Sequence, residues 1–263
     1  ATLEELYSFI EASPKRHDQF KKLQEDLELV PVVSLKRHAA TRWESHSKVL
    51  KDVKATYPAI IKMLQDVMKK ETASDVVSKA NGLLTYSKTF EFVLMVVVFD
   101  AILQQTSLLS KTLQGSAIDL HEDFQLVDTC VGNLKSLRDE ALLEEFIQQA
   151  RNIAEKADVH TSFADKRCRK KKRQFDERSS VEVSTDPAAR FKRDVYFLSL
   201  DIIEHQMNAR FGKNRNVMAA FYCFSPESLS KRSPSENKAS LEKIFKEYGP
   251  GGSGDVKREV FHE

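Results

Sequence analysis

The tripeptide Thr41-Arg42-Trp43 contains the only tryptophan of the chain, and basic side chains surround it. A cation beside a flat aromatic ring can hold a phosphate while the ring stacks on an unpaired base. The pattern is therefore compatible with DNA binding. From the residue type alone, the favoured interpretation is that Trp43 anchors a hydrophobic core, because tryptophan side chains are highly buried on average. The candidate DNA-binding residues are Arg42 and Trp43, with Lys36 and Arg37 before them and Lys48 after them.

A second basic feature lies at residues 166–173, where only Cys168 interrupts a run of lysines and arginines. Such a run can be a nuclear localisation signal, a contact to the phosphate backbone, or a solvated loop. It indicates no target sequence, since phosphate contacts carry no sequence information. The basic residues of this run are Lys166, Arg167, Arg169, Lys170, Lys171, Lys172 and Arg173.

The sequence has none of the common enzyme signatures, whether GxxxxGKS, HExxH, GxSxG or GxGxxG. Acidic pairs occur at Glu4-Glu5 and Glu144-Glu145. Adjacent helical residues point about 100° apart, so neither pair can hold a metal by itself. The three cysteines are far apart and form no CxxC pair, which indicates neither a disulfide framework nor a zinc site. We expect a reducing, intracellular compartment.

The composition is that of a folded chain with a local basic surface. Of the 263 residues, 41% are hydrophobic, which excludes a chain that is disordered throughout. The net charge is only +2, so any surface that attracts nucleic acid must be confined to part of the molecule. The longest apolar run, Phe92 to Phe99, is much shorter than the roughly 20 residues of a membrane span. We therefore expect no membrane partner.

The elements that carry these residues are expected to be helices. No proline lies between Pro58 and Pro187, and apolar residues recur at intervals of three and four. We predict a mainly α, multi-helix bundle with little or no strand, Val30 to Leu35 being the one strand candidate. The predicted apolar stripes are Leu120, Phe124, Val127, Val131 and Leu134; Leu142 or Leu143 with Phe146, Ala150 and Ile153; and Val195, Leu198, Ile202 and Ala209.

Capping residues predict where several helices begin and end. Pro58 suits the first turn of a helix to about Lys70, and Thr72 or Ser74 suits the cap of the next. Asp186-Pro187 predicts the start of a helix to about Phe211, which Gly212 would end.

Three further stretches require a choice between helix, strand and loop. The stretch Thr89 to Leu113 combines a β-prone Val96-Val97-Val98 with the length of a helix, and we predict a helix. Serine, proline and glycine predict loops or linkers at Ser225–Asn237 and Gly249–Gly254.

Several motifs, taken in order, resemble the hAT superfamily of DNA transposases, and within it the transposase-derived proteins with MYM-type zinc fingers or THAP-like domains. Thr41-Arg42-Trp43-Glu44 is the most specific motif, and the collinear order extends the resemblance over nearly the whole chain. The matching segments are Leu6–Ile10 with Ser13–His17, Leu35–Arg37 with Thr41–Glu44, Phe90–Leu103 with Thr106–Leu113, and Asp194–Phe211.

The resemblance implies a role for the tryptophan. In this superfamily an RNase H-like fold carries three catalytic carboxylates, which bind two divalent metal ions for strand cleavage and transfer. An all-helical domain is inserted between the second and third carboxylates. An Arg-Trp pair near its start stabilises an unpaired base at a DNA end, which offsets part of the cost of extruding that base. By motif, Arg42 and Trp43 would be this pair.

The segments that carry the superfamily's carboxylates have no counterpart here, so the resemblance implies the helical insertion with short flanks. Such a region would be inert as a nuclease alone and hold no cofactor, whereas the full transposase would require a divalent metal such as Mg²⁺. Whether the whole protein is an active or a domesticated transposase stays open. The expected division is an RNase H-like flank at 1–40, insertion parts at 41–165 and 186–248, a disordered basic and polar loop at 166–185, and a tail at 249–263.

The expected partner is DNA, as transposon ends or flanking hairpins, and the expected location is the nucleus. A homo-oligomer and nuclear protein partners are compatible with this. The alternative function is a non-enzymatic helical scaffold in a nuclear regulatory protein, in which a stripe such as Leu120 to Leu134 contacts partner helices. An intramolecular core is the other explanation of such a stripe.

Overall fold

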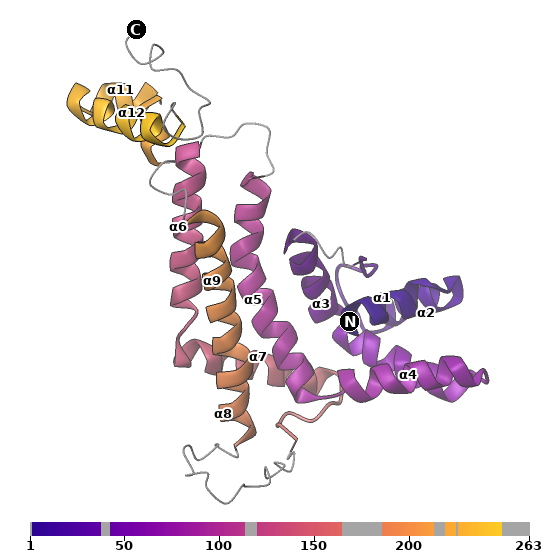
Figure 1. Cartoon of the computed structure of the whole chain (residues 1–263). Helices are drawn as coiled ribbons and strands as arrows, with labels where there is room; N and C mark the ends of the chain where they lie inside the picture. Colours follow the sequence, from indigo (N-terminus) through magenta and orange to yellow (C-terminus); the bar gives the residue numbers. More distant parts are fainter. Residues whose placement is uncertain are drawn as a thin grey trace, which may run out of the picture. The chain divides into compact units, whose positions relative to one another are not determined.

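The computed structural model describes residues 2–37, 43–113, 120–164, 186–212, 219–224 and 226–248. These residues are mainly helical and form no strand, which confirms the predicted fold class (Figure 1). The elements are α1 (Thr2–Glu11), α2 (Pro14–Asp26), α3 (Trp43–Lys70), α4 (Ser74–Ser87), α5 (Phe90–Leu113), α6 (Leu120–Ser136), α7 (Glu140–Lys156), α8 (Pro187–Phe191), the π-helix η1 (Lys192–Phe197), α9 (Leu198–Phe211), the 3₁₀-helix η2 (Phe221–Phe224), α11 (Pro226–Lys231) and α12 (Pro234–Tyr248).

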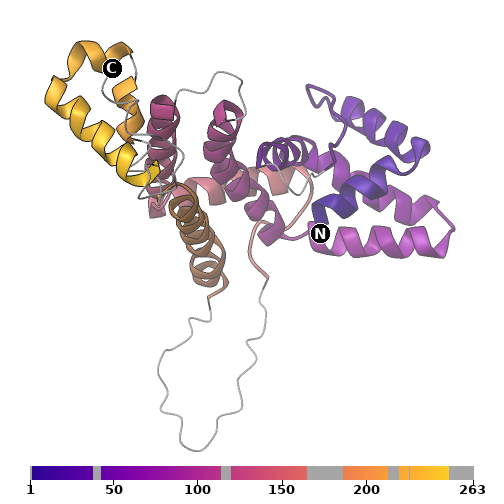
Figure 2. The ribbon, with the colours of Figure 1, turned by 45° about the horizontal axis from the view of Figure 1, so that its top comes forward.

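The chain divides into two compact units. Unit 1 comprises residues 1–107 and 137–200, and unit 2 comprises residues 108–136 and 201–263. In unit 2, α6 and α9 run side by side in both views (Figures 1 and 2). There Lys135 lies 3.3 Å from Glu204. The division of the chain expected from the sequence stays a prediction.

Helix α3 is the central element of unit 1 and continues through Pro58. The prediction that Pro58 opens a helix is therefore wrong. Proline has no N–H to bond the carbonyl of Lys54, and inside a helix it costs about 3 kcal/mol or more. Each fully buried aliphatic side chain contributes roughly 1.5–3 kcal/mol, so a few of them outweigh this cost. The buried hydrophobic residues of α3 are Val49, Leu50, Val53, Tyr57, Ala59, Ile60, Ile61, Met63, Leu64 and Val67.

The turn before Pro58 connects α3 to its neighbours. Tyr57 donates a 2.7 Å hydrogen bond from its hydroxyl to the carbonyl of Ser87, at the end of α4. Its ring stacks on Phe92 of α5, with centroids 6.2 Å apart. Lys54 forms an ion pair with Asp100 of α5 at 2.9 Å. Burial also raises the pKa of the Tyr57 hydroxyl, so it remains a donor.

Helix α5 confirms the prediction of a long helix over Thr89 to Leu113. The expectation that the chain has no membrane partner stays a prediction. The helix has 24 residues with a mean hydropathy of 1.9 in its most apolar window, which is enough by length and composition to cross a membrane. However, 56% of that window is buried in protein, and the core helix of a globular domain meets the same criteria.

The strand candidate Val30 to Leu35 forms no strand. Instead, the fully buried side chain of Gln24 pairs with the backbone of Val33. Its Nε2 donates to the carbonyl of Val33, and its Oε1 accepts from the amide of Val33, both at 2.9 Å. One side-chain amide thus supplies the two hydrogen bonds that a neighbouring strand would give this residue, and it holds the segment that leads to Lys36 and Arg37.

Helix ends agree with the capping predictions only in part. Asp186 accepts bonds from the amides of Ala188 and Ala189, as predicted, and the helical run ends at Phe211. Gly212 fits closely there, because a Cβ atom on it would lie 2.4 Å from the carbonyl oxygen of Asn208. The prediction for α4 is wrong, since Ala73 occupies the cap position and makes no side-chain bond there.

The predicted stripe Val195, Leu198, Ile202 and Ala209 is wrong, because Leu198 and Ile202 are about half exposed. The wide π turn of η1 adds a residue to the helix and changes the register of the faces around it. A neighbouring row is buried instead: Phe191, Tyr196, Leu200 and Met207.

The expected loop at Ser225–Asn237 is also wrong, since α11 and the first turn of α12 occupy most of it. Pro226 and Pro234 are first residues of helices, where the missing N–H costs nothing. Ser233 and Glu236 cap α12 reciprocally: the Ser233 amide donates to the Glu236 carboxylate, and the Glu236 amide donates to the Ser233 hydroxyl. Serine and proline here begin helices rather than linkers.

Replacing Gln24 tests the role of this side chain. The change Gln24→Ala removes two hydrogen bonds to Val33 and is expected to lower the free energy of unfolding by about 1–3 kcal/mol. Urea unfolding followed by circular dichroism measures this change. The matched control is Gln148→Ala on α7, whose side chain is exposed and should leave the midpoint nearly unchanged. Equal midpoints for the two variants would contradict the proposed role.

Candidate functional site

The tripeptide that opened the sequence argument lies at the start of α3, whose first residue is Trp43. Thr41 and Arg42 lie outside the described residues, and so does the side chain of Trp43. The two interpretations of Trp43, base stacking and core anchor, therefore both stay predictions. The basic run Lys166, Arg167, Arg169, Lys170, Lys171, Lys172 and Arg173 also lies outside the described residues.

The other candidate residues are exposed, and the structure gives two of them acidic neighbours. Arg37 lies 3.5 Å from Glu4 of α1, with 78% of its side chain exposed. An ion pair as exposed as this contributes only about 0–1 kcal/mol, so a phosphate could replace Glu4 at little cost. Lys36 lies within electrostatic range of Asp52 on α3. Lys48 is exposed in the second turn of α3.

Two lysines act electrostatically on the carboxyl group of Asp52. Lys36, from the segment before the tripeptide, and Lys51, from α3, both lower the pKa of this carboxyl. Burial acts more strongly in the opposite direction, and the net pKa is raised. The Oδ2 atom of Asp52 is buried and has no hydrogen-bond partner among the described residues. Both lysines thus act electrostatically on an incompletely satisfied carboxylate, and an incoming phosphate would compete with Asp52 for them.

An aromatic cavity of about 320 Å³ lies beside the first turns of α3, in unit 1. His46 and Leu50 of α3 form one wall. His46 lies three residues after Trp43, and Leu50 lies about one turn after His46. The sequence analysis missed this cavity, since four helices contribute to it. The one available signal was the recurrence of bulky residues on α5. The remaining residues around it are Thr2, Leu3, Glu4, Tyr86, Phe92, Met95, Val96, Phe99 and Leu103.

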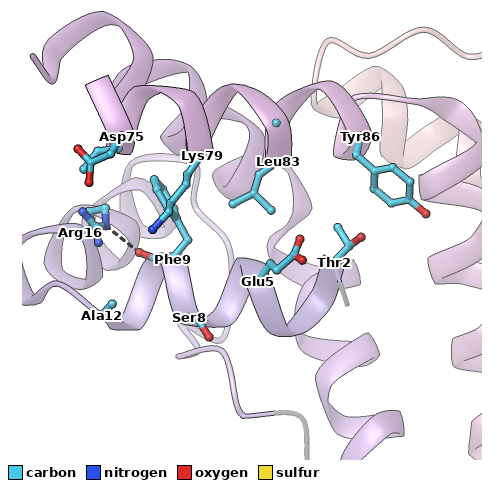
Figure 3. A pocket seen from close by; sticks show the side chains of 12 residues that line it. Thr2, Glu5, Ser8, Phe9, Ala12, Arg16, Asp75, Lys79, Leu83 and Tyr86 are labelled. Carbon is cyan, nitrogen blue, oxygen red and sulfur yellow. Dashed lines mark hydrogen bonds between the residues drawn. The ribbon is translucent and has the colours of Figure 1, made fainter. Parts of the chain in front are cut away.

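A larger groove, of about 800 Å³, lies between α1 and α4 (Figure 3). Phe9 and Leu83 form its largely buried floor. Arg16, at the start of α2, donates from Nε to the carbonyl of Phe9 at 2.7 Å, and its guanidinium carbon lies 4.7 Å from the centre of the Phe9 ring. The sequence analysis assigned this groove no function. It is formed by segments about 70 residues apart, so no local pattern shows it.

Metal ligands do not cluster in the described part of the chain: no three His, Cys, Asp or Glu side chains come together there. Cys130 and Cys223 are both buried thiols that form no disulfide among the described residues, and burial raises the pKa of each. A protonated thiol is a poor nucleophile and a poor metal ligand. Neither cysteine therefore adds a reactive group to the candidate sites.

No family model matches the chain, and no solved structure matches it. The function must therefore be argued from the residues and the geometry described above.

The carboxyl of Asp52 predicts a pH dependence. Because its pKa is raised in the folded state, the folded protein binds this proton more tightly than the unfolded chain does. The contribution of Asp52 to stability is therefore greatest at acidic pH and declines as the pH rises above about 4, through the raised pKa. We expect Asp52→Asn to remove this decline and to raise the urea midpoint at pH 7.

Urea unfolding of both proteins between pH 4 and 8, an estimated window around the aspartate pKa, measures the effect. Asp18→Asn, on the exposed face of α2, is the matched control and should follow the wild type. A variant Asp52→Asn that follows the same pH dependence as the wild type would contradict the assignment.

Proposed function

We propose that this chain is the DNA-end-binding helical region of a hAT-type transposase or of a domesticated, transposase-derived protein. The observation that supports it best is the set of exposed cations, Lys36, Arg37, Lys48 and Lys51, on either side of Trp43 in the sequence, with Trp43 as the first residue of α3. Lys51 lies about 12 Å along α3 from Trp43, which equals the axial rise of roughly three to four base pairs of a duplex. One DNA end can therefore engage both positions.

In the proposed mechanism, the basic side chains attract the DNA backbone and Trp43 holds an unpaired terminal base. Phosphates replace Glu4 beside Arg37 and compete with Asp52 for Lys36 and Lys51. Arg42 contacts the phosphate next to the base stacked on Trp43. The aromatic cavity lined by His46 offers further apolar surface one turn along α3, as flipped bases require.

The region is proposed to be inert as a nuclease alone. Strand cleavage would need the superfamily's carboxylate set and its divalent metal, for which the resemblance assigns no residue of this chain. The basic run at 166–173 is proposed as a nuclear localisation signal or a further backbone contact. The nucleus is the proposed location.

The alternative function, a helical scaffold, has less support from the described residues. It required the stripe Leu120 to Leu134 to be available to partner helices. Val127 and Leu134 are 5% and 1% exposed and belong to the core of unit 2. We therefore propose no partner for this stripe.

Trp43→Ala is expected to weaken binding to a duplex that carries an unpaired terminal base by about 1–3 kcal/mol, or roughly 5- to 150-fold. The physical reason is the loss of one base-aromatic stacking interaction. Fluorescence anisotropy with labelled duplexes measures the affinity. Trp43→Phe keeps an aromatic face and should retain most of it.

A salt titration provides the control for the proposed phosphate contacts. Affinity of the wild type should fall steeply with salt, and Lys36→Ala should reduce the slope of log K against log salt by about 1. Equal affinities of wild type and Trp43→Ala for the unpaired end would exclude base stacking. Absence of binding even at low salt would overturn the proposed function as a whole.

A further inference from the structure

The groove between α1 and α4 combines small wall residues with an apolar floor (Figure 3). Ser8 and Ala12 line the α1 side, and Gly82 lines the α4 side. A Cβ atom on Gly82 would meet no atom within 4 Å, so this part of the wall opens into free space. Helix-internal glycine lowers helix stability relative to alanine. Gly82 therefore weakens α4 while it keeps the groove wide.

The charged side chains of the groove are arranged by sign. In Figure 3, Arg16, Lys79 and Asp75 lie toward one end, and Glu5 lies with Thr2 and Tyr86 toward the other. Lys79, Asp75 and Glu5 form no ion pair with each other or with any other described residue. One end thus carries net positive charge and the other net negative charge, with Phe9 and Leu83 between them.

The length of the groove matches a helix of about three turns. Thr2 lies at the same end as Tyr86, and Ala12 at the same end as Asp75, so α1 and α4 run antiparallel along the two walls. From Asp75 to Tyr86 the wall is about 16 Å long, or three helical turns. Helices pack with their axes about 8–10 Å apart, and the short distances require small residues such as Ser8, Ala12 and Gly82.

We propose that this groove is a docking site for an amphipathic helix of a partner protein. The partner helix places apolar side chains at i, i+4 and i+7 along the groove, where the half-exposed ring of Tyr86 and the edges of Phe9 and Leu83 provide the apolar surface. It carries an acidic residue facing Arg16 and Lys79, and a basic residue about three turns away facing Glu5. The small wall residues admit the helix backbone. The groove shares Thr2 and Tyr86 with the aromatic cavity beside α3.

The test uses a fluorescein-labelled synthetic helix as the probe. It has leucines at the stated spacing, a glutamate at one end and a lysine at the other. A peptide of the same composition with its leucines distributed around the helix is the control probe. We expect the whole chain to bind the amphipathic peptide with an affinity at least about tenfold higher than its affinity for the scrambled peptide.

Gly82→Leu adds a side chain on the groove wall whose Cβ atom meets no atom within 4 Å, and leucine favours the helix over glycine. We expect it to reduce peptide affinity about tenfold or more. Gly132→Leu is the matched control, since Gly132 also lies inside a helix with open space around its Cβ position, on α6 of unit 2. That variant should bind the peptide as the wild type does.

Lys79→Glu gives both ends of the groove an acidic character. We expect it to weaken the peptide with one glutamate and one lysine and to favour a peptide with lysine at both ends. Equal binding of the amphipathic peptide to wild type, Gly82→Leu and Lys79→Glu would overturn the proposal, as would absence of binding to the wild type. A dimer in light scattering that Gly82→Leu dissociates would also overturn it, because the occupant would then be a second copy of the chain.

Discussion

The ion pair between Lys54 and Asp100 is the interaction on which unit 1 depends most. Asp100 is 2% exposed in the middle of the apolar helix α5, and its only described partner is Lys54 of α3 at 2.9 Å. A buried carboxylate without a partner costs about 3–5 kcal/mol. An apolar helix such as α5 could slide along α3 with small changes in packing energy. The one buried carboxylate penalises every register except that in which it meets Lys54.

The same turn of α3 fixes the position of its N-terminal half. Tyr57, three residues after Lys54, bonds the last residue of α4 and stacks on α5. These contacts surround Pro58, so α3 remains continuous where its backbone bonding is weakest. Because α3 is unbroken, the contacts of this turn also fix the positions of Asp52, Lys51 and the first residue, Trp43. The proposed DNA site and the aromatic cavity thus depend on the pairing of α3 with α4 and α5.

Local patterns in the sequence predicted most of the helices but not the contacts between distant segments. The absence of proline and the spacing of apolar residues predicted α5 and α7, and Asp186-Pro187 predicted a capped helix. Pro58 was misassigned, because burial of α3 outweighs a local penalty that no neighbouring residue reveals. The predicted apolar stripe through Val195, Leu198, Ile202 and Ala209 is wrong because the π-helix η1 changes the number of residues per helical turn. The pairing of Gln24 with Val33, the electrostatic effect of Lys36 on Asp52, and the groove between α1 and α4 depend on tertiary packing.

The central claim, that Trp43 stacks on an unpaired base, can be measured directly because this is the only tryptophan of the chain. Its intrinsic fluorescence reports on one side chain without a label. We predict that a duplex with an unpaired terminal base quenches this fluorescence and protects it from acrylamide, and that a fully paired duplex of the same length does so much less. Anisotropy in the same sample shows whether the unpaired duplex binds. If it binds while the tryptophan spectrum and the acrylamide quenching stay unchanged, the claim is contradicted.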